Sequence, residues 1–156
     1  MKELAEKLKT FYPIKYRKST NDCILYKNGT IYYTDYTDIV HETAHWAVAT
    51  PTQRTQINYG LGTEPRSYVE TVRIMPLNKA SLIEAEACMV TIAWETLWYG
   101  AADQTEIFWQ DISRKSPKID LTGDTDAVYC YGRRRVQSAV NKMQKLTGNQ
   151  IEWILK

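Results

Sequence analysis

Two histidines four residues apart, His41 and His45, constrain this chain more than any other feature of its sequence. They begin and end the run HETAH, which matches the HExxH motif, and the chain contains no other histidine. Residues four apart share one face of an α-helix, so both imidazoles can bind one divalent metal ion. Glu42 then lies beside a metal-bound water, where it can act as a general base. The run is therefore expected to be a helix with a metal site on one face.

An alternative interpretation treats both histidines as helix residues that only form hydrogen bonds in the core. The metal interpretation is favoured because the only two histidines of the chain fall at this spacing and a glutamate follows the first. Apolar flanks also predict buried imidazoles, and buried polar rings need partners. The flanking residues are Ile39, Val40, Ala44, Trp46 and Val48.

Length and composition indicate one globular domain that spans residues 1–156. A hydrophobic fraction of 44% in 156 residues is enough for a single core. The net charge of +2 is too small to indicate nucleic-acid binding by itself. No stretch reaches the roughly 18 apolar residues of a membrane helix, and the charged first residues contain no signal-peptide core. We therefore expect a cytoplasmic protein that does not contact membranes.

Local patterns predict an α+β fold in which a small sheet with a hairpin packs against helices. Two β-branched and aromatic runs, residues 23–27 and 30–34, are joined by Asn28-Gly29. Asn-Gly accepts the positive φ angles of a type I′ turn, so the two runs are expected to form the hairpin. The fold expected around it is of zincin type, with the HExxH motif on the central helix.

The histidine helix is expected to begin at Thr37 or Asp38, either of which can cap it, and to end near Ala49. Apolar periodicity predicts the other elements. They are a helix that ends near residue 12, a strand at 67–74, an apolar helix at 80–99 before Gly100, a short helix at 103–112, an amphipathic helix at 124–146, loops at 50–66 and 113–123, and a packed tail at 151–155.

A third metal ligand is expected from the helix at 80–99, which contains Glu84, Glu86 and Glu95. Glu86 shares a helical stripe with Met89, Val90, Ala93 and Leu97, whereas the stripe of Glu84 is more mixed and includes Ala87, Cys88, Thr91 and Glu95. An unpaired carboxylate is costly on a buried apolar face, and a metal explains its presence there. Glu86 is therefore the preferred ligand and Glu84 the reserve, since a regular helix cannot direct both at one metal.

The same three ligands are compatible with two kinds of chemistry. Around zinc they leave a position for a water whose pKa falls to about 7, with Glu42 as the base for hydrolysis. Around ferrous iron they form a facial triad with positions for dioxygen and substrate. The sequence does not choose between zinc and iron, and it contains no flavin, pterin or nucleotide signature.

Basic residues concentrate on the last predicted helix, and three cysteines are spread through the chain. The basic residues are Arg133, Arg134, Arg135, Lys142 and Lys145. A solvated helix face is favoured over a docking patch for a partner. The cysteines, Cys23, Cys88 and Cys130, are odd in number and lack a CxxC pair, which favours reduced, buried thiols that are not ligands.

The sequence around the histidines resembles the elongation factor P hydroxylase family. The resemblance is carried by HETAHWAVA at 41–49, then Arg54, then Asn58-Tyr59-Gly60. Pro65-Arg66 matches a Pro and Arg of the family, and Glu86 with Trp94 matches its later Glu and Trp. The similarity covers about residues 23–100, and it also favours Glu86 over Glu84.

This resemblance implies a metal-dependent enzyme that hydroxylates a lysine of a protein substrate, either elongation factor P or another translation-related factor. His41, His45 and Glu86 would be the ligands and Glu42 the catalytic residue. The resemblance further implies that four residues support the ligands or the substrate cleft, namely Trp46, Arg54, Tyr59 and Arg66. Short relatives of this type occur among bacteriophage proteins.

Two other functions stay open. The segment Glu84-Ala85-Glu86-Ala87 is also similar to the ligand helix of zincin-type metallopeptidases, including anti-restriction proteins that share HExxHW. The segment around Glu86 departs from the hydroxylase pattern, with Ala87-Cys88-Met89 in place of a basic, glutamine-bearing stretch. Retained ligands with altered substrate residues are also typical of a non-catalytic phage protein that binds a host partner.

Overall fold

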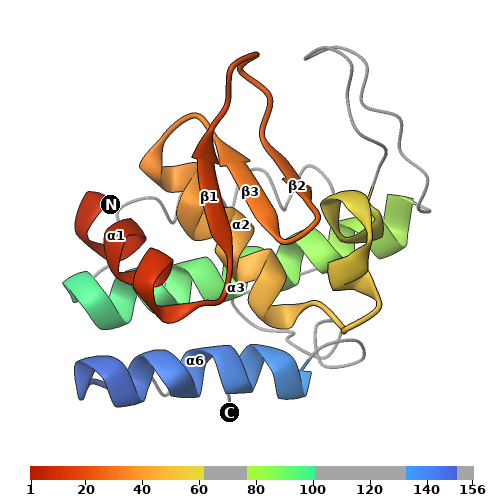
Figure 1. Cartoon of the computed structure of the whole chain (residues 1–156). Helices are drawn as coiled ribbons and strands as arrows, with labels where there is room; N and C mark the ends of the chain where they lie inside the picture. The colour runs from red at the N-terminus through yellow and green to blue at the C-terminus, as the bar shows by residue number, and fades with distance from the viewer. Residues whose placement is uncertain (62–76, 101–132, 151–156) are drawn as a thin grey trace. The chain divides into compact units, whose positions relative to one another are not determined.

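The computed structural model describes residues 1–61, 77–100 and 133–150. It divides into two compact units, Met1–Pro76 and Leu77–Lys156. The described residues form four α-helices and a three-stranded mixed sheet, so the predicted α+β class is confirmed (Figure 1). The single domain expected from the length of the chain stays a prediction. Among the described residues, no helix combines the length and apolarity needed to cross a bilayer.

The first unit holds all three strands and the histidine helix. Its elements are α1 (Lys2–Phe11), β1 (Lys15–Lys18), β2 (Leu25–Lys27), β3 (Thr30–Tyr33), α2 (Tyr36–Val48) and the short 3-10 helices η1 (Gln53–Thr55) and η2 (Ile57–Gly60). Helix α1 contacts α2, and α2 contacts β3. Leu4 and Leu8 of α1 are fully buried, whereas Phe11 is 38% exposed although it falls at the same helical spacing.

Strand β3 lies in the centre of the sheet, whose order is β1-β3-β2. It runs parallel to β1 and antiparallel to β2, with Ile31 opposite both Tyr16 and Tyr26. Successive side chains of a strand point to opposite faces, so these three residues share one face. That face lies toward α2, because the Tyr16 hydroxyl is 2.9 Å from the hydroxyl of Thr43. The sheet therefore positions the histidine helix through aromatic side chains.

The hairpin prediction is confirmed. Strands β2 and β3 pair antiparallel, with Lys27 opposite Thr30. The two turn residues have φ angles of +49° at Asn28 and +75° at Gly29, as a type I′ turn requires.

Helix α2 begins one residue earlier than predicted, and Asp35 is its cap, not Thr37 or Asp38. The Asp35 carboxylate accepts hydrogen bonds from the backbone N–H groups of Thr37 at 2.7 Å and Asp38 at 3.2 Å. The Asp38 carboxylate accepts in return from the backbone of Asp35 at 3.1 Å, which completes a capping box. The helix ends at Val48, two residues before Thr50 and Pro51, close to the predicted end.

The second unit contains two helices that contact each other, α3 (Leu77–Tyr99) and α6 (Arg133–Thr147). Helix α3 begins three residues before the predicted start and ends before Gly100, whose φ is +84°. The indole of Trp94 donates a hydrogen bond to the carbonyl of Ala139 at 3.1 Å. On the described part of α6, Val136, Val140 and Met143 are buried, as the amphipathic helix predicted at 124–146 requires.

Several sequence predictions lie outside the described residues. They are the strand at 67–74, the short helix at 103–112, the loop at 113–123, the tail at 151–155, the start of the last helix at 124–132, and the residues Arg66 and Cys130. Cys23 and Cys88 are free and buried, as expected. The described part of the predicted loop at 50–66 forms the short helices η1 and η2.

The capping box predicts how α2 responds to substitution of Asp35. Asp35→Ala removes the acceptor for two backbone N–H groups and should lower the free energy of unfolding by about 1 kcal/mol. Asp35→Asn is the matched control, because Asn caps about as well as Asp. Urea unfolding followed by circular dichroism measures both variants. Equal loss of stability in the two variants would contradict the assignment of Asp35 as the cap.

Candidate metal centre

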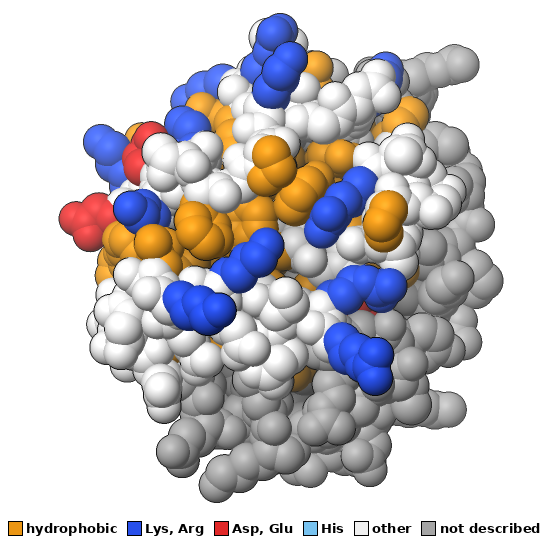
Figure 2. Space-filling view, turned by 60° about the horizontal axis from the view of Figure 1, so that its bottom comes forward, with side chains coloured by type: hydrophobic (Ala, Val, Ile, Leu, Met, Phe, Trp, Pro, Cys, Tyr) orange, Lys and Arg blue, Asp and Glu red, His pale blue; other side chains and the backbone are white. Residues whose placement is uncertain are grey.

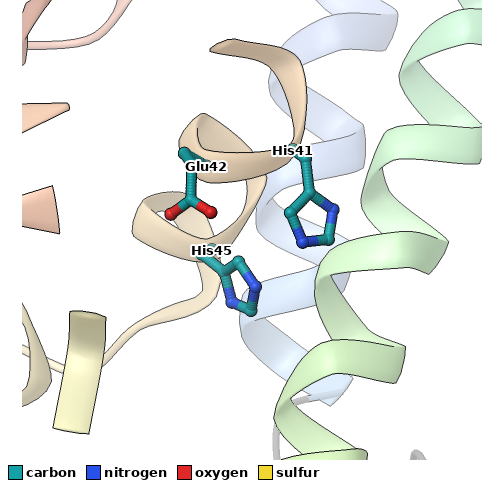
Figure 3. A group of neighbouring side chains, drawn as sticks. All are labelled: His41, Glu42 and His45. Atoms are coloured by element: carbon teal, nitrogen blue, oxygen red, sulfur yellow. The ribbon is translucent and has the colours of Figure 1, made fainter. Parts of the chain in front are cut away.

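His41, Glu42 and His45 form a cluster on α2. Each residue offers one ligand atom, and the three atoms lie within 4.8 Å of one another. The imidazole centroids are 4.7 Å apart with the rings perpendicular, and both rings lie on one side of the helix with Glu42 beside them (Figure 3). His45 is 2% exposed, whereas His41 and Glu42 are half-buried. In the part of the chain that the structure describes, this is the one such group of His, Cys, Asp or Glu.

The donor set of the cluster fits a divalent transition metal. Imidazole nitrogen and carboxylate oxygen are the ligands that zinc and ferrous iron use in proteins. The neighbouring α2 residues Val40, Ala44 and Val48 are buried and apolar, so the nitrogens lie next to a surface that competes little for the ion. The group can therefore hold a metal ion.

Tyr59 fixes the environment of His45. Its ring stacks on the His45 ring at a centroid distance of 5.4 Å and on the Tyr26 ring at 4.3 Å. Its hydroxyl donates a hydrogen bond to the backbone carbonyl of Glu42 at 2.8 Å. One buried side chain thus holds both the second imidazole and the backbone turn that carries Glu42.

The backbone at Tyr59 is strained. Asn58 and Tyr59 have φ angles of +47° and +57°, in the left-handed region that costs roughly 1–2 kcal/mol for a residue with a Cβ atom. The Asn58 side chain offsets part of this cost, since its oxygen accepts a hydrogen bond from the Tyr26 backbone at 2.9 Å. The Tyr26 hydroxyl in turn donates to the carbonyl of Arg54 at 2.6 Å. Strained positions that are held by several contacts cluster at functional sites.

Arg54 and Trp46 lie together at the C-terminal end of α2. The Arg54 guanidinium carbon is 3.7 Å from the Trp46 ring centroid, a cation–π contact. The Arg54 Nε donates to the carbonyl of Trp46 at 2.9 Å, and Tyr12 makes an edge contact with the same ring at 5.7 Å. A cation beside the last carbonyls of a helix complements its dipole. Both residues thereby hold the end of the motif helix.

Two phenols near the motif stay protonated at neutral pH. Burial raises the pKa of Tyr16 to about 12, although its hydrogen bond with Thr43 opposes the shift. Burial also raises the pKa of Tyr59 well above its usual value, and the carboxylate of Glu42 adds to this effect. Tyr59 therefore acts as a hydrogen-bond donor to the motif helix.

Sequence reasoning missed Tyr16 and Tyr26. Tyr26 could have been found, because two-residue alternation in the predicted hairpin places it on the same face as Ile31. Tyr16 had no such signal, since its strand consists of the residues Lys-Tyr-Arg-Lys and was not predicted.

Of the other predicted site residues, Glu86 lies on α3 in the second unit and Arg66 lies outside the described residues. Glu86 is 5% exposed, and its Oε1 accepts no hydrogen bond from a described residue. Burial raises the pKa of Glu86 to about 7, and the positive charge of Arg135 opposes the shift. The reserve ligand, Glu84, is half-buried.

Glu86 is buried and Glu84 half-buried, but the other residues of the two α3 stripes do not differ in burial. The stripe of Glu84 was expected to be a mixed surface, yet its other members are also buried, namely Ala87, Cys88, Thr91 and Glu95. Helix α3 is buried on most of its circumference from residue 86 to residue 95, so amphipathic periodicity could not separate its faces. Glu95 is 1% exposed and is a second buried carboxylate on this helix.

The basic side chains of α6 are exposed where they are described. These are Arg134, Arg135, Lys142 and Lys145. On the face drawn in Figure 2, Lys and Arg side chains stand apart, with uncharged and hydrophobic side chains between them. The exposure of the four α6 side chains fits the favoured expectation of a solvated helix face.

Comparison of the chain with family models, with curated proteins and with solved structures finds no match.

The raised pKa of Glu86 predicts how the stability of the metal-free protein depends on pH. The pKa in the folded state, about 7, exceeds the ordinary glutamate value of 4.5, so the unfolded chain loses this proton first as the pH rises. Glu86 thus contributes stability below pH 4.5 that is lost as the pH rises through 7, by at most about 1.4 kcal/mol per pH unit. Relative to wild type, Glu86→Gln should therefore gain stability between pH 5 and pH 8.

Urea unfolding in the presence of a chelator at several pH values measures this difference. Met89→Leu on the same helix is the control, because it replaces one buried uncharged side chain by another and its stability difference from wild type should not change with pH. A stability difference between Glu86→Gln and wild type that stays constant from pH 5 to pH 8 would contradict the prediction.

Proposed function

We propose that this protein is a metal-dependent enzyme in which His41 and His45 bind one divalent metal ion and Glu42 is the catalytic residue. The observation that carries the proposal is the approach of three ligand atoms to within 4.8 Å on one side of α2. When bound, the metal supplies Lewis acidity, and it lowers the pKa of a coordinated water if it is zinc or offers positions for dioxygen and substrate if it is ferrous iron.

Residues of the chain would transfer the proton, orient the imidazole of His45 and anchor the motif helix. The Glu42 carboxylate accepts and returns the proton of the reacting group. Tyr59 keeps the His45 ring in one orientation by stacking on it and anchors the Glu42 backbone through its hydroxyl. Arg54 and Trp46 hold the C-terminal end of the helix.

Glu86 is our proposed third ligand because of its burial and its unused oxygen atom. A carboxylate that is 5% exposed, with one oxygen that accepts no hydrogen bond from the described residues, is costly unless a cation is near. A divalent metal would offset that cost better than Arg135, whose effect on the Glu86 pKa is smaller than that of burial.

The zincin-like arrangement is part of the same proposal. It is supported by a small mixed sheet whose aromatic face lies toward α2, with β3 in contact with that helix. The motif helix is thereby fixed by a sheet on one side and by η2 at its middle, where Tyr59 contacts the Glu42 carbonyl.

Oxygen-dependent hydroxylation of a protein lysine is the leading reaction, with elongation factor P or another translation-related factor as substrate. It is supported by the residues that carry the resemblance outside the HExxH core. Tyr59 contacts His45, and Arg54 contacts Trp46, so both residues lie against the motif helix.

Zinc-dependent peptide hydrolysis is the second candidate. It is favoured by the position of Glu42, whose carboxylate lies close to the imidazole nitrogens, where a general base for hydrolysis is needed.

The two reactions are separated by loading the purified protein with ferrous iron or with zinc. We expect the iron-loaded protein, in air and with a two-electron reductant such as ascorbate, to insert one oxygen atom of dioxygen into a C–H bond of a lysine of elongation factor P, while the other oxygen atom is reduced to water. Mass spectrometry of the intact substrate measures the added oxygen. Glu42→Gln should retain the metal and lose at least about 100-fold of the rate, because general acid–base catalysis contributes that much.

Cleavage of an unfolded protein by the zinc-loaded form, lost in Glu42→Gln, would establish the peptidase instead. Absence of both reactions with either metal would contradict the proposal that the protein is an enzyme.

A further inference from the structure

A pocket lies over the three-stranded sheet of the first unit. Its volume is about 440 Å³, and it is lined by β1, β2, β3 and the loop after β1. This volume is within the range of about 300–1,000 Å³ that is typical of small-molecule sites. The lining residues are Arg17, Lys18, Ser19, Thr20, Asn21, Cys23, Leu25, Lys27, Asn28, Thr30 and Tyr32.

The pocket belongs to the face of the sheet opposite the histidine helix. Arg17 and Leu25 both lie opposite Tyr32, so these residues share a face. Strand alternation places Tyr16 on the other face, which contacts α2 through Thr43. The pocket is therefore distinct from the metal centre.

The charge of the pocket is one-sided. Its lining contains three cationic side chains, Arg17, Lys18 and Lys27, and its described part contains no Asp or Glu. Within residues 1–61, neither Arg17 nor Lys18 forms an ion pair. Uncompensated cations in a concave site attract an anion, and Arg presents a planar fork that matches phosphate oxygens.

The other groups in the lining suit a phosphate ester. Hydroxyl groups of Thr20 and Thr30 and the amides of Asn21 and Asn28 are neutral donors. Tyr32 is half-buried and offers an aromatic surface, on which a nucleobase can stack. A ligand that combines a phosphate with a planar base would contact both the hydrogen-bond donors and the aromatic surface of Tyr32.

The wall of the pocket is preformed. The Ser19 backbone N–H donates to the carbonyl of Tyr33 at 2.7 Å, and the Ser19 hydroxyl donates to the Asn21 side chain at 2.9 Å. The Asn21 side-chain oxygen also accepts from the backbone of Cys23 at 3.3 Å, and Cys23 is buried. Binding therefore requires little ordering of this loop, which favours affinity.

We propose that this pocket binds the phosphate group of a nucleotide, with Arg17 as its principal cationic contact, because Arg17 shares the pocket face with Leu25 and Tyr32. The nucleotide is either free or part of a single-stranded nucleic acid, since both present the same phosphate and base. The site is independent of the proposed metal-dependent reaction.

Isothermal titration of the full-length protein with AMP tests the proposal, in the presence of a chelator so that metal-bridged binding does not contribute. AMP should bind, adenosine without a phosphate should bind at least about tenfold more weakly, and a short single-stranded RNA should show whether a chain is preferred. Tighter binding of the RNA than of AMP identifies nucleic acid as the source, and equal binding identifies the free nucleotide. Either result supports phosphate binding in this pocket.

Arg17→Gln should weaken AMP binding at least about tenfold, because the charge-assisted contact to the phosphate is lost. The Arg17 side chain is exposed, so the variant should fold as wild type does. Lys15→Gln is the matched control, since Lys15 is exposed on the same strand but does not line the pocket, and its binding should stay within about twofold. Absence of binding of AMP and RNA, or equal binding by Arg17→Gln and wild type, would overturn the proposal.

Discussion

The buried imidazole of His45 is the constraint on which the rest of the first unit depends. A polar ring that is 2% exposed must be held in a defined orientation, because an imidazole away from water is costly unless its nitrogens are used. The ring of Tyr59 supplies that orientation by stacking, at the expense of a left-handed backbone at two consecutive residues. The second stacking partner, Tyr26, comes from the hairpin, so the sheet and the 3-10 turn are joined at the candidate metal centre.

The same helix is fixed at both ends by polar contacts. Asp35 and Asp38 satisfy the free N–H groups at its start, and Arg54 contacts the carbonyl of Trp46 at its end. Between these ends, Thr43 meets the Tyr16 hydroxyl of the sheet. A helix held at its two ends and in its middle keeps two imidazoles four residues apart in register, which is what a metal ion with fixed ligand geometry requires.

The parts of this structure that could be predicted from sequence depend on local chemistry. Asn28-Gly29 requires a type I′ turn wherever it occurs between strands, and HETAH in an apolar context requires a helix. Strand β1 could not be predicted, because its four residues carry three positive charges and acquire strand geometry only by pairing with β3. The cap was misplaced because Asp35, Thr37 and Asp38 are all good capping residues, and the choice depends on where the preceding strand ends.

The candidate site could likewise be predicted from the sequence only in part. The spacing of His41 and His45 predicted their shared helix face, whereas the stacking of Tyr59 depends on a backbone conformation that few sequences specify. On α3, the burial of both stripes follows from tertiary packing and leaves no amphipathic signal from which a ligand could be chosen.

Metal analysis of the protein purified without chelator tests the central claim most directly. The account predicts one divalent metal ion per wild-type chain. His41→Ala and His45→Ala, each shown to be folded by circular dichroism, should each retain less than about a tenth of it. Wild-type protein free of metal even after incubation with zinc or ferrous iron, or equal metal content in wild type and both variants, would contradict it.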